Sequence, residues 1–226
     1  MSHEEHNLSE PLAFFGGTFD PVHYGHLRCA DEARQKLNME TLYLLPAGTP
    51  PHRDLPQTST GQRLEMLNLA LAEFPRLVID DRETRRSGLS YMVDTLQEVR
   101  AEFPQRPLLL LIGQDAANHL HSWHRWKQLF ELAHIVILTR PGTKTEYRHD
   151  LAREIERRLS PDVQTLLRSK AGGVLSMQVV SIDISATTIK SIIRLGRSPG
   201  SMLPGPVLDY IVENQLYLPT QSSPKI

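Results

Sequence analysis

The chain has 226 residues, of which 40% are hydrophobic and 23% are charged, a balance typical of a globular protein that buries its own core. The formal net charge of -1 and the pI near 6.8 argue against a nucleic-acid scaffold or a polybasic membrane surface. The single cysteine, Cys29, excludes an internal disulfide, and the sequence shows neither a secretory signal nor an apolar run approaching the roughly 18 residues of a membrane span. We therefore expect a cytoplasmic protein with no nucleic-acid or membrane partner.

Short apolar runs of strand length recur along the chain. They are Leu12–Phe15, Leu42–Leu45, Leu77–Ile79, Leu108–Ile112, Ile135–Leu138 and Val174–Ile182. Continuous apolar runs suit strands that are covered on both faces, as in a parallel sheet. Segments with helical periodicity separate the runs, so the sequence predicts an α/β fold built on a doubly wound parallel sheet.

The helical segments are recognised by apolar side chains spaced three or four residues apart. These are Leu27, Ala30, Ala33 and Leu37; Leu64, Leu67 and Leu71; Val93, Leu96 and Val99; and Trp126, Leu129 and Leu132. A further charged helix is expected over Asp150–Lys170. Two long stretches, Pro46–Thr60 and Thr139–Arg148, are expected to be functional loops.

The end of the chain predicts a small helical region. Ser185 or Thr187 is a suitable N-cap for a helix that Gly196 closes, and a last amphipathic helix is expected over Pro206–Gln215. We expect one domain over residues 11–218, with residues 183–218 as its helical part. The segments 1–10 and 219–226 are expected to be flexible.

The segment GGTFDPVHYGH, Gly16–His26, follows the first predicted strand and leads into the first predicted helix. In open α/β sheets, ligands bind beyond the carboxyl ends of the strands. Glycines let the backbone approach a phosphate, and the helix N-terminus favours negative charge. The segment contains neither G-x-G-x-x-G nor a Walker A sequence, so it predicts a different kind of phosphate site.

Two histidines take the place of the lysine of a Walker A loop. If the helix begins near Tyr24, His23 and His26 lie on one side of it, and Gly25 leaves open space between them. Imidazoles there could donate hydrogen bonds to phosphate oxygens. A zinc site would need more ligands than the neighbouring residues offer. A strand–turn–helix corner with incidental histidines explains the combination of special residues less well.

The same segment resembles the (T/H)-x-G-H signature of a nucleotidyltransferase superfamily. Further pieces resemble the bacterial nicotinate-mononucleotide adenylyltransferases within it: Pro50–Arg53, Ser90–Leu96, Ile112–Asp115, His121–Leu129, Thr139–Gly142, Ile184–Lys190 and Val207–Tyr217. The likeness covers almost all of residues 12–217 in the expected order. It implies a Rossmann-like fold that transfers AMP from ATP to nicotinate mononucleotide, giving deamido-NAD and pyrophosphate.

The implied chemistry needs no covalent intermediate, because the attacking phosphate oxygen is already ionised at neutral pH. The enzyme would position the substrates and stabilise charge on the α-phosphate, with Mg²⁺ neutralising the triphosphate. The resemblance implies His23, His26 and Lys190 as catalytic groups. The ATP-binding residues that it implies are Gly16, Gly17, Thr18, Phe19, His26, Asp115, Ser185, Thr187 and Lys190. The sequence pattern of the family usually has arginine where Lys190 stands, and lysine lacks the planar fork of arginine.

The resemblance also implies the residues of the acceptor site. Tyr91 and Trp123 would stack on the pyridinium ring, and backbone N–H groups near Val93 and His124 would hold the nicotinate carboxylate. Arg53 and Arg140 are candidates for the phosphate of the mononucleotide. Asp115 would accept hydrogen bonds from a ribose, and it is equally suited to cap a helix.

Two clusters are better explained without a function. The spacing of His119, His121 and His124 does not place them on one helix face, which argues against a metal site. Arg82, Arg85 and Arg86 alternate with acidic residues, as on a solvated surface. Two other functions stay open: a related phosphopantetheine adenylyltransferase or cytidylyltransferase, and a nucleotide sensor without turnover. The sequence leaves assembly into a homo-oligomer open.

Overall fold

The computed structural model describes residues 10–50, 56–180 and 182–219. Within these residues, six parallel strands form one sheet in the order β3-β2-β1-β4-β5-β6. Their bounds are β1 Leu12–Gly17, β2 Leu42–Pro46, β3 Leu77–Ile79, β4 Leu108–Gly113, β5 His134–Thr139 and β6 Val174–Gln178. The chain moves outward from β1 to β3 and returns to the other side of β1 at β4. This reversal confirms the predicted doubly wound sheet and leaves a crevice beyond the carboxyl ends of β1 and β4.

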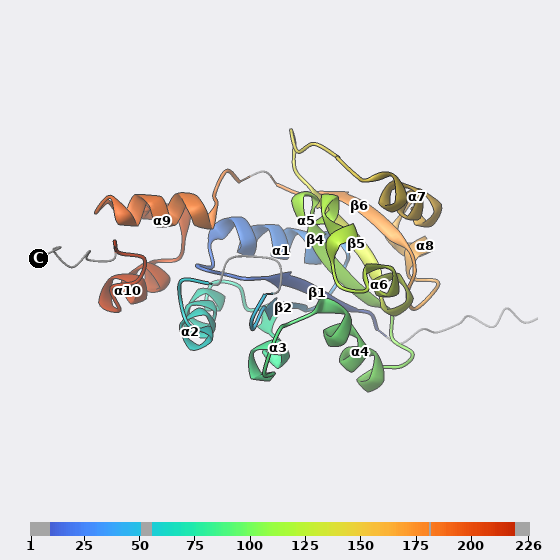
Figure 1. Cartoon of the computed structure of the whole chain (residues 1–226), viewed down its shortest axis with the longest axis horizontal. Coiled ribbons are helices and arrows are strands. Elements are labelled where there is room, and N and C mark those ends of the chain that lie inside the picture. The colour runs from blue at the N-terminus through green and yellow to red at the C-terminus, as the bar shows by residue number, and fades with distance from the viewer. Residues whose placement is uncertain (1–9, 51–55, 181, 220–226) are drawn as a thin grey trace, which may run out of the picture.

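Helices cover both faces of the sheet (Figure 1). Their bounds are α1 Tyr24–Lys36, α2 Thr60–Leu71, α3 Arg82–Arg85, α4 Met92–Glu102, α5 Gln114–Asn118, α6 Trp126–Leu132, α7 His149–Arg158, α8 Val163–Leu166, α9 Ala186–Arg194 and α10 Gly205–Glu213. Short 3-10 turns lie at Leu120–Ser122 and Gly200–Met202.

The two faces of the sheet bury separate hydrophobic cores. Along β4, Leu109 and Leu111 belong to the cluster that also contains buried residues of α1, α2, α9 and α10, whereas Leu108, Leu110 and Ile112 belong to the cluster with buried residues of α4, α6 and α7. This alternation follows from the two-residue period of a strand. It explains why the strands are continuous apolar runs, since every position faces a covered side.

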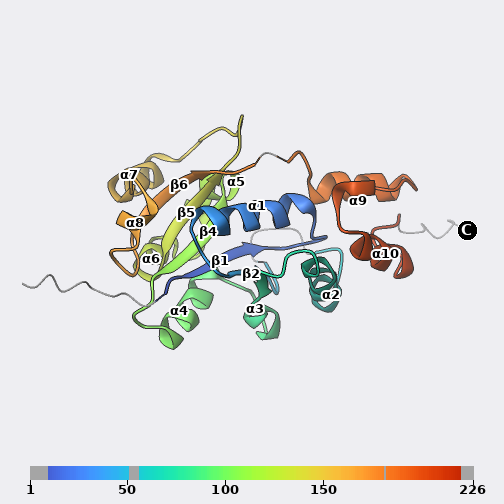
Figure 2. The same cartoon turned by 180° about the vertical axis from the view of Figure 1, so that it is seen from behind.

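The helical end of the chain lies beyond the carboxyl ends of the central strands. Figure 1 shows α9 and α10 at one end of the molecule, with α10 near α2, and Figure 2 shows the same arrangement from behind. Ile189 and Val207 belong to the same buried cluster as the residues of α1. The end of the chain therefore packs onto the part of the fold that carries Gly16–His26.

Several predicted boundaries are corrected by the structure. One helix over Asp150–Lys170 is wrong: α7 ends at Arg158 and the separate α8 begins at Val163. Pro161 lies between them, and proline cannot donate the backbone hydrogen bond that would continue a helix. The last strand ends at Gln178 and not at Ile182. The first strand extends through Gly17, so the two glycines belong to the strand.

The predicted flexible segments, 1–10 and 219–226, fall almost wholly outside the described residues, as does Arg53 of the Pro46–Thr60 loop. None of the helices in the described part of the chain has the length and apolar character needed to cross a bilayer.

Candidate active site

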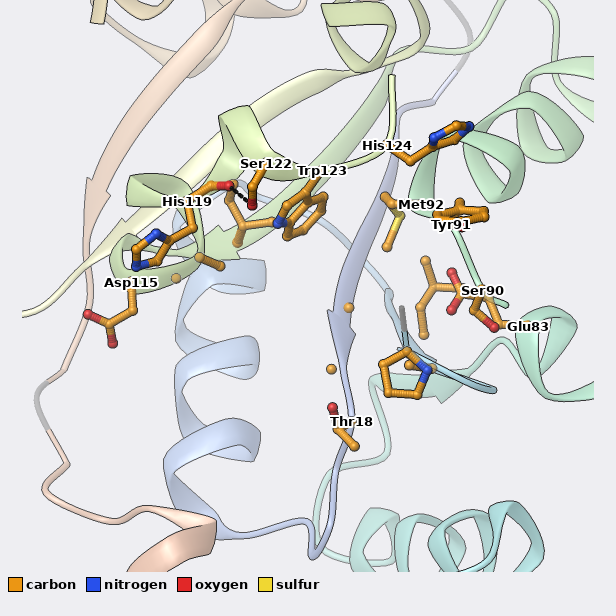
Figure 3. Close-up of a pocket in the computed structure, with 18 residues that line it drawn as sticks. Thr18, Glu83, Ser90, Tyr91, Met92, Asp115, His119, Ser122, Trp123 and His124 are labelled. Atoms are coloured by element: carbon orange, nitrogen blue, oxygen red, sulfur yellow. Dashed lines mark hydrogen bonds between the residues drawn. The ribbon is translucent and has the colours of Figure 1, made fainter. Parts of the chain in front are cut away.

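A cavity of about 530 Å³ opens at the carboxyl ends of β1 and β4, where the order of the strands reverses. Its wall contains residues of four regions of the sequence: Gly16, Gly17, Thr18, Leu45, Ala47, Pro50, Glu83, Ser90, Tyr91, Met92, Gly113, Asp115, His119, Trp123 and His124, among others. A cavity of this volume suits a ligand of nucleotide size. In Figure 3, Asp115 and His119 lie on one side of the cavity, and Glu83, Ser90 and Tyr91 lie on the other.

The two glycines at the end of β1 lie in close contact with neighbouring side chains. A Cβ atom on Gly16 would lie 3.0 Å from the Cε atom of Met92, and one on Gly17 would lie 2.8 Å from the ring of Phe19. Phe19 itself is buried and has a positive φ of 51°. Its ring packs edge-to-face against His26, with centroids 5.1 Å apart. In the described structure, Phe19 therefore packs against this histidine and does not line the cavity.

His23 and His26 lie together at the start of α1, which begins at Tyr24 as expected. Their rings stack with centroids 3.7 Å apart and planes 24° apart. A Cβ atom on Gly25 would lie 2.9 Å from His23 Nδ1 and 3.1 Å from the carbonyl oxygen of Ile184. The close approach of α1 to the segment before α9 therefore needs a residue without a side chain at position 25.

His23 is held in its neutral form. Its side chain is only 5% exposed, and its Nδ1 atom is buried without a hydrogen-bond partner in the described structure. Burial, reinforced by the positive charge of Arg140, lowers the pKa of His23 to about 4. At neutral pH the ring can therefore donate or accept a hydrogen bond, and it brings no positive charge.

Asp20 is the centre of a buried hydrogen-bond network that the sequence did not reveal. Its Oδ1 atom accepts hydrogen bonds from Thr58 Oγ1 and from the hydroxyl of Tyr217, each at 2.7 Å. Its Oδ2 atom accepts from the backbone N–H of Gln57 at 3.0 Å and from Lys190 Nζ at 2.7 Å. Burial opposes ionisation of this carboxyl group, but the bonds from Lys190, Thr58, Tyr217 and Gln57 outweigh it and lower the pKa of Asp20.

The network also determines where Lys190 lies. The side chain of Lys190 is 17% exposed, that of Asp20 is 5% exposed, and the two form an ion pair. Lys190 is therefore attached to the loop that contains His23 and leads to His26, although it does not itself line the cavity in the described structure. Its predicted contact with a triphosphate stays a prediction.

Arg63 is the second residue that the sequence did not single out. It is a charged residue of helix α2, yet it is only 1% exposed. Its guanidinium donates to the carbonyl oxygens of Thr18, Ala47 and Gly48 at 3.0, 2.6 and 2.9 Å. Because burial lowers the pKa of Arg63, these carbonyl groups and the negative charge of Asp20 are what keep it charged inside the protein. Arg63 thus joins the ends of β1 and β2 beneath the cavity.

The predicted aromatic residues of the acceptor site do meet at the cavity. Trp123 follows the turn Leu120–Ser122, and Tyr91 is the N-cap residue of α4 (Figure 3). The ring of Tyr91 lies 4.4 Å from that of His124, centroid to centroid. Val93 is fully buried, so only its backbone could face a ligand.

Asp115 and Arg140 form an ion pair at the entrance. Arg140 Nη2 lies 3.4 Å from Asp115 Oδ2, and the Asp115 side chain is 76% exposed. The proposed capping role of Asp115 is wrong, because Gly113 occupies the N-cap position of α5. The exposed carboxylate remains available for a ribose, while Arg140 lies close enough to His23 to influence its pKa.

Glu83 is a further residue that sequence reasoning missed. It is 3% exposed at the cavity wall, and Thr95 Oγ1 donates a hydrogen bond to its carboxylate at 2.7 Å. Burial raises the pKa of Glu83. Nothing in the sequence indicates that Glu83 is buried, because it lies in a run of alternating charges in which the acidic residues look alike.

The start of α9 is capped as predicted. Ser185 is the N-cap residue, and its hydroxyl oxygen accepts a hydrogen bond from the backbone N–H of Thr188 at 3.1 Å. Thr187 lies in the first turn and is exposed. Gly196 follows the helix with a φ of +69°, as expected for a residue that closes it. Contact of Ser185 and Thr187 with phosphates stays a prediction.

The arginine cluster forms ion pairs, whereas two members of the histidine cluster line the cavity. Arg82, Arg85 and Arg86 each form an ion pair with a nearby acidic side chain. Of the three clustered histidines, His119 and His124 line the cavity. Within residues 10–50, 56–180 and 182–219, no group of three or more histidine, cysteine or acidic side chains is arranged to hold a metal ion.

The chain is similar to known proteins over most of its length. A family profile described as cytidylyltransferase-like matches residues 14–192. A relative from Dechloromonas aromatica, named "probable nicotinate-nucleotide adenylyltransferase", is 44% identical over 93% of this chain and 99% of its own. A relative of the same name from Methylococcus capsulatus is 44% identical over 91% of this chain and 99% of its own.

A solved structure shares the fold at low sequence identity. The Plasmodium falciparum nicotinic acid mononucleotide adenylyltransferase complexed with NaAD superposes with a TM-score of 0.72 at 15% identity, covering 92% of this chain and 98% of its own. The sequence relatives match over nearly their whole length and therefore carry the assignment. The chain belongs to the nicotinate-nucleotide adenylyltransferase family.

Proposed function

We propose that this protein transfers the adenylyl group of ATP to nicotinate mononucleotide, forming deamido-NAD and pyrophosphate. The observation that carries the proposal is the stacked pair of His23 and His26 at the end of β1, beside a cavity lined by Tyr91 and Trp123. The histidines suit a phosphate-transfer centre, and the aromatic rings suit a pyridinium acceptor. The relatives named nicotinate-nucleotide adenylyltransferase, which match over nearly their whole length, support the same reaction.

Direct in-line attack fits the groups that the site offers. The acceptor phosphate is ionised at neutral pH, so the reaction needs no strong general base. The protein would hold the two substrates in line and stabilise charge on the transferring phosphate through His26, His23 and the N-terminal amides of α1. Cys29 gives no support for a covalent intermediate, because burial raises the pKa of its thiol to about 11.

The residues present are compatible with Mg²⁺ that arrives with ATP. Mg²⁺ usually keeps several waters and binds through one or two carboxylates and substrate phosphates, so it needs no complete protein cage. Asp115 is an exposed carboxylate at the cavity and is the described residue best placed to approach such an ion. When bound, the ion would neutralise part of the charge of the triphosphate. We expect the reaction to take place in the cytoplasm without nucleic acid or membrane.

The decisive test is a steady-state assay of the purified protein with ATP and each of three acceptors, nicotinate mononucleotide, nicotinamide mononucleotide and phosphopantetheine, and with CTP and a phosphorylated alcohol. We expect deamido-NAD and pyrophosphate in equal amounts with the first acceptor, and a lower kcat/KM with the second. Product formation only with phosphopantetheine or the phosphorylated alcohol would assign the chain to another branch of the superfamily.

The same assay addresses a sensor that binds nucleotide without turnover. Such a protein would bind ATP and nicotinate mononucleotide in calorimetry and yet form no product. The buried His23 and its contact with His26 count against this alternative, because an unpartnered buried ring nitrogen costs stability and is retained most readily where it has a use.

A further inference from the structure

Lys190 is a flexible cation that is restrained on two sides. Its Nζ atom donates to Asp20 Oδ2 at 2.7 Å and lies 5.4 Å from the centroid of the Tyr217 ring. A lysine side chain loses much of its rotamer freedom when it is ordered. If the side chain is already restrained in the free protein, less rotamer entropy is lost when a ligand binds.

Tyr217 forms one of these restraints directly and holds the carboxylate that forms the other. Its ring faces the ammonium group, and its hydroxyl donates to Asp20 Oδ1 at 2.7 Å. Tyr217 is 6% exposed, and burial together with the charge of Asp20 raises its pKa, so the hydroxyl keeps its proton and remains a donor. The phenol thus binds Oδ1 of Asp20, whereas Lys190 binds Oδ2. Tyr217 and Lys190 therefore hold different oxygens of the same carboxylate.

The geometry connects this pair to the phosphate site. Asp20 belongs to the loop between β1 and α1, which also carries His23. Lys190 lies on α9, and the carbonyl oxygen of Ile184, just before that helix, approaches Gly25 of α1. An ammonium group anchored to Asp20 is thereby held beside the residues expected to meet the triphosphate, and it is still 17% exposed.

We propose that Tyr217 is a positioning residue of the ATP site, whose ring and hydroxyl, the latter through Asp20, hold the ammonium group of Lys190 for the triphosphate. The inference rests on the proposed function, because it takes ATP as the substrate and Lys190 as one of its phosphate ligands. It assigns a task to the segment after α10, which is otherwise remote from the cavity. It also explains how lysine can serve where the family usually has arginine, since the network supplies the order that the planar fork of arginine would bring.

The test is a double-mutant cycle in ATP affinity. Calorimetry with ATP and Mg²⁺ is performed on the wild-type chain, Tyr217→Phe, Lys190→Met and the double variant, with no acceptor present. We expect Tyr217→Phe to weaken ATP binding about three- to tenfold, because a hydrogen bond to a charged group is lost. In the Lys190→Met background the same change should weaken binding less than twofold, because its effect passes through the ammonium group.

Two further variants make the result specific. Tyr210→Phe, on α10, is the matched control: it removes a phenol from the same part of the chain, and we expect unchanged ATP affinity. Lys190→Arg in the Tyr217→Phe background should restore affinity to within about twofold of the wild type, because a guanidinium can bond to Asp20 through two N–H groups. Thermal denaturation of every variant reports whether it is folded.

An equal loss of ATP affinity on Tyr217→Phe in the wild-type chain and in the Lys190→Met background would overturn the proposal, and so would a failure of Lys190→Arg to restore binding. Steady-state kinetics provide an independent readout: the KM for ATP should rise in Tyr217→Phe while kcat changes less than twofold. If the wild-type chain bound ATP and formed no deamido-NAD, the proposed function would fail, but the cycle in ATP affinity would still decide the role of Tyr217.

Discussion

His23 and His26 stack ring on ring, with centroids 3.7 Å apart, at the point where the chain leaves β1 and enters α1. The two rings differ in their surroundings. His23 is buried beneath the helix start, whereas His26 is partly exposed and packs edge-to-face against the buried ring of Phe19. We infer that His26 makes the larger change of contact during the reaction, and that His23 helps to hold it in place.

Replacing His26 with alanine tests this division of roles. The variant should lower kcat by about a hundredfold or more, because a preorganised donor acts most strongly on charge that develops in the transition state. Its ATP affinity should fall less than about fivefold. Single-turnover kinetics and calorimetry measure the two quantities separately. Normal turnover of the variant would refute the assigned role.

The buried His23 predicts a dependence of stability on pH. Its pKa is lowered from 6.5 to about 4 in the folded protein, so protons bind the unfolded chain first as the pH falls. The contribution of neutral His23 to the free energy of unfolding is complete above pH 6.5. It is lost between about pH 6.5 and 4, and the loss amounts to at most roughly 3 kcal/mol. Urea denaturation of the wild type and His23→Asn at several pH values should show a shallower decline for the variant. Parallel curves would contradict the prediction.

Gly25 and Gly61 form a matched pair for testing the close approach of α1. Alanine normally stabilises a helix relative to glycine by about 0.5–1 kcal/mol. At Gly61, where the nearest atom to an added Cβ is 4.0 Å away, we expect that gain. At Gly25 the added Cβ meets His23 and Ile184, so we expect a loss of about 1–3 kcal/mol and at least a tenfold lower kcat. Thermal unfolding and initial rates measure both; a stabilised, active Gly25→Ala variant would rule out the steric argument.

We predict that a positive charge without a guanidinium cannot replace Arg63 beneath the cavity. Lysine at this position keeps the charge, but it cannot reach the carbonyl groups of Thr18, Ala47 and Gly48 with the same fork. We expect Arg63→Lys to cost about 2–4 kcal/mol of unfolding free energy, because buried acceptors lose their donors. Arg76→Lys, at an exposed ion pair, is the control and should change stability by less than about 0.5 kcal/mol. Chemical denaturation gives both values, and equal effects would remove the special role of Arg63.

The two tryptophans allow the acceptor site to be tested within one chain. Trp123 lines the cavity, whereas Trp126 packs edge-to-face against Phe130 of the core. Trp123→Ala should raise the KM for nicotinate mononucleotide about five- to thirtyfold, because a stacking partner worth roughly 1–2 kcal/mol is lost, with little change in the KM for ATP. Trp126→Phe should lower stability and leave both KM values within about twofold. An unchanged acceptor KM in the Trp123 variant would place the pyridinium elsewhere.

The strands and most helices were predictable because each follows from local pattern. Apolar runs such as Leu108–Ile112 are buried on both faces, and Ser185 and Gly196 begin and end α9 through chemistry within one turn. Prediction failed where a single residue interrupted a pattern, as at Pro161 between α7 and α8. It also failed for the short helices α3 and α5, which are too brief to show a period.

At the site, the sequence and the tertiary structure determined different features. Sequence alone determined which segments build it, since Gly16–His26, Tyr91 and Trp123 lie in contiguous, recognisable stretches that do meet at or beside the cavity. The tertiary structure decided the surroundings of Asp20, whose partners Lys190 and Tyr217 are 170 and 197 residues away along the chain. It likewise decided that Arg63 is buried and that His23 is neutral. Burial and long-range hydrogen bonds depend on which segments the folded chain brings together, and no local spacing encodes that.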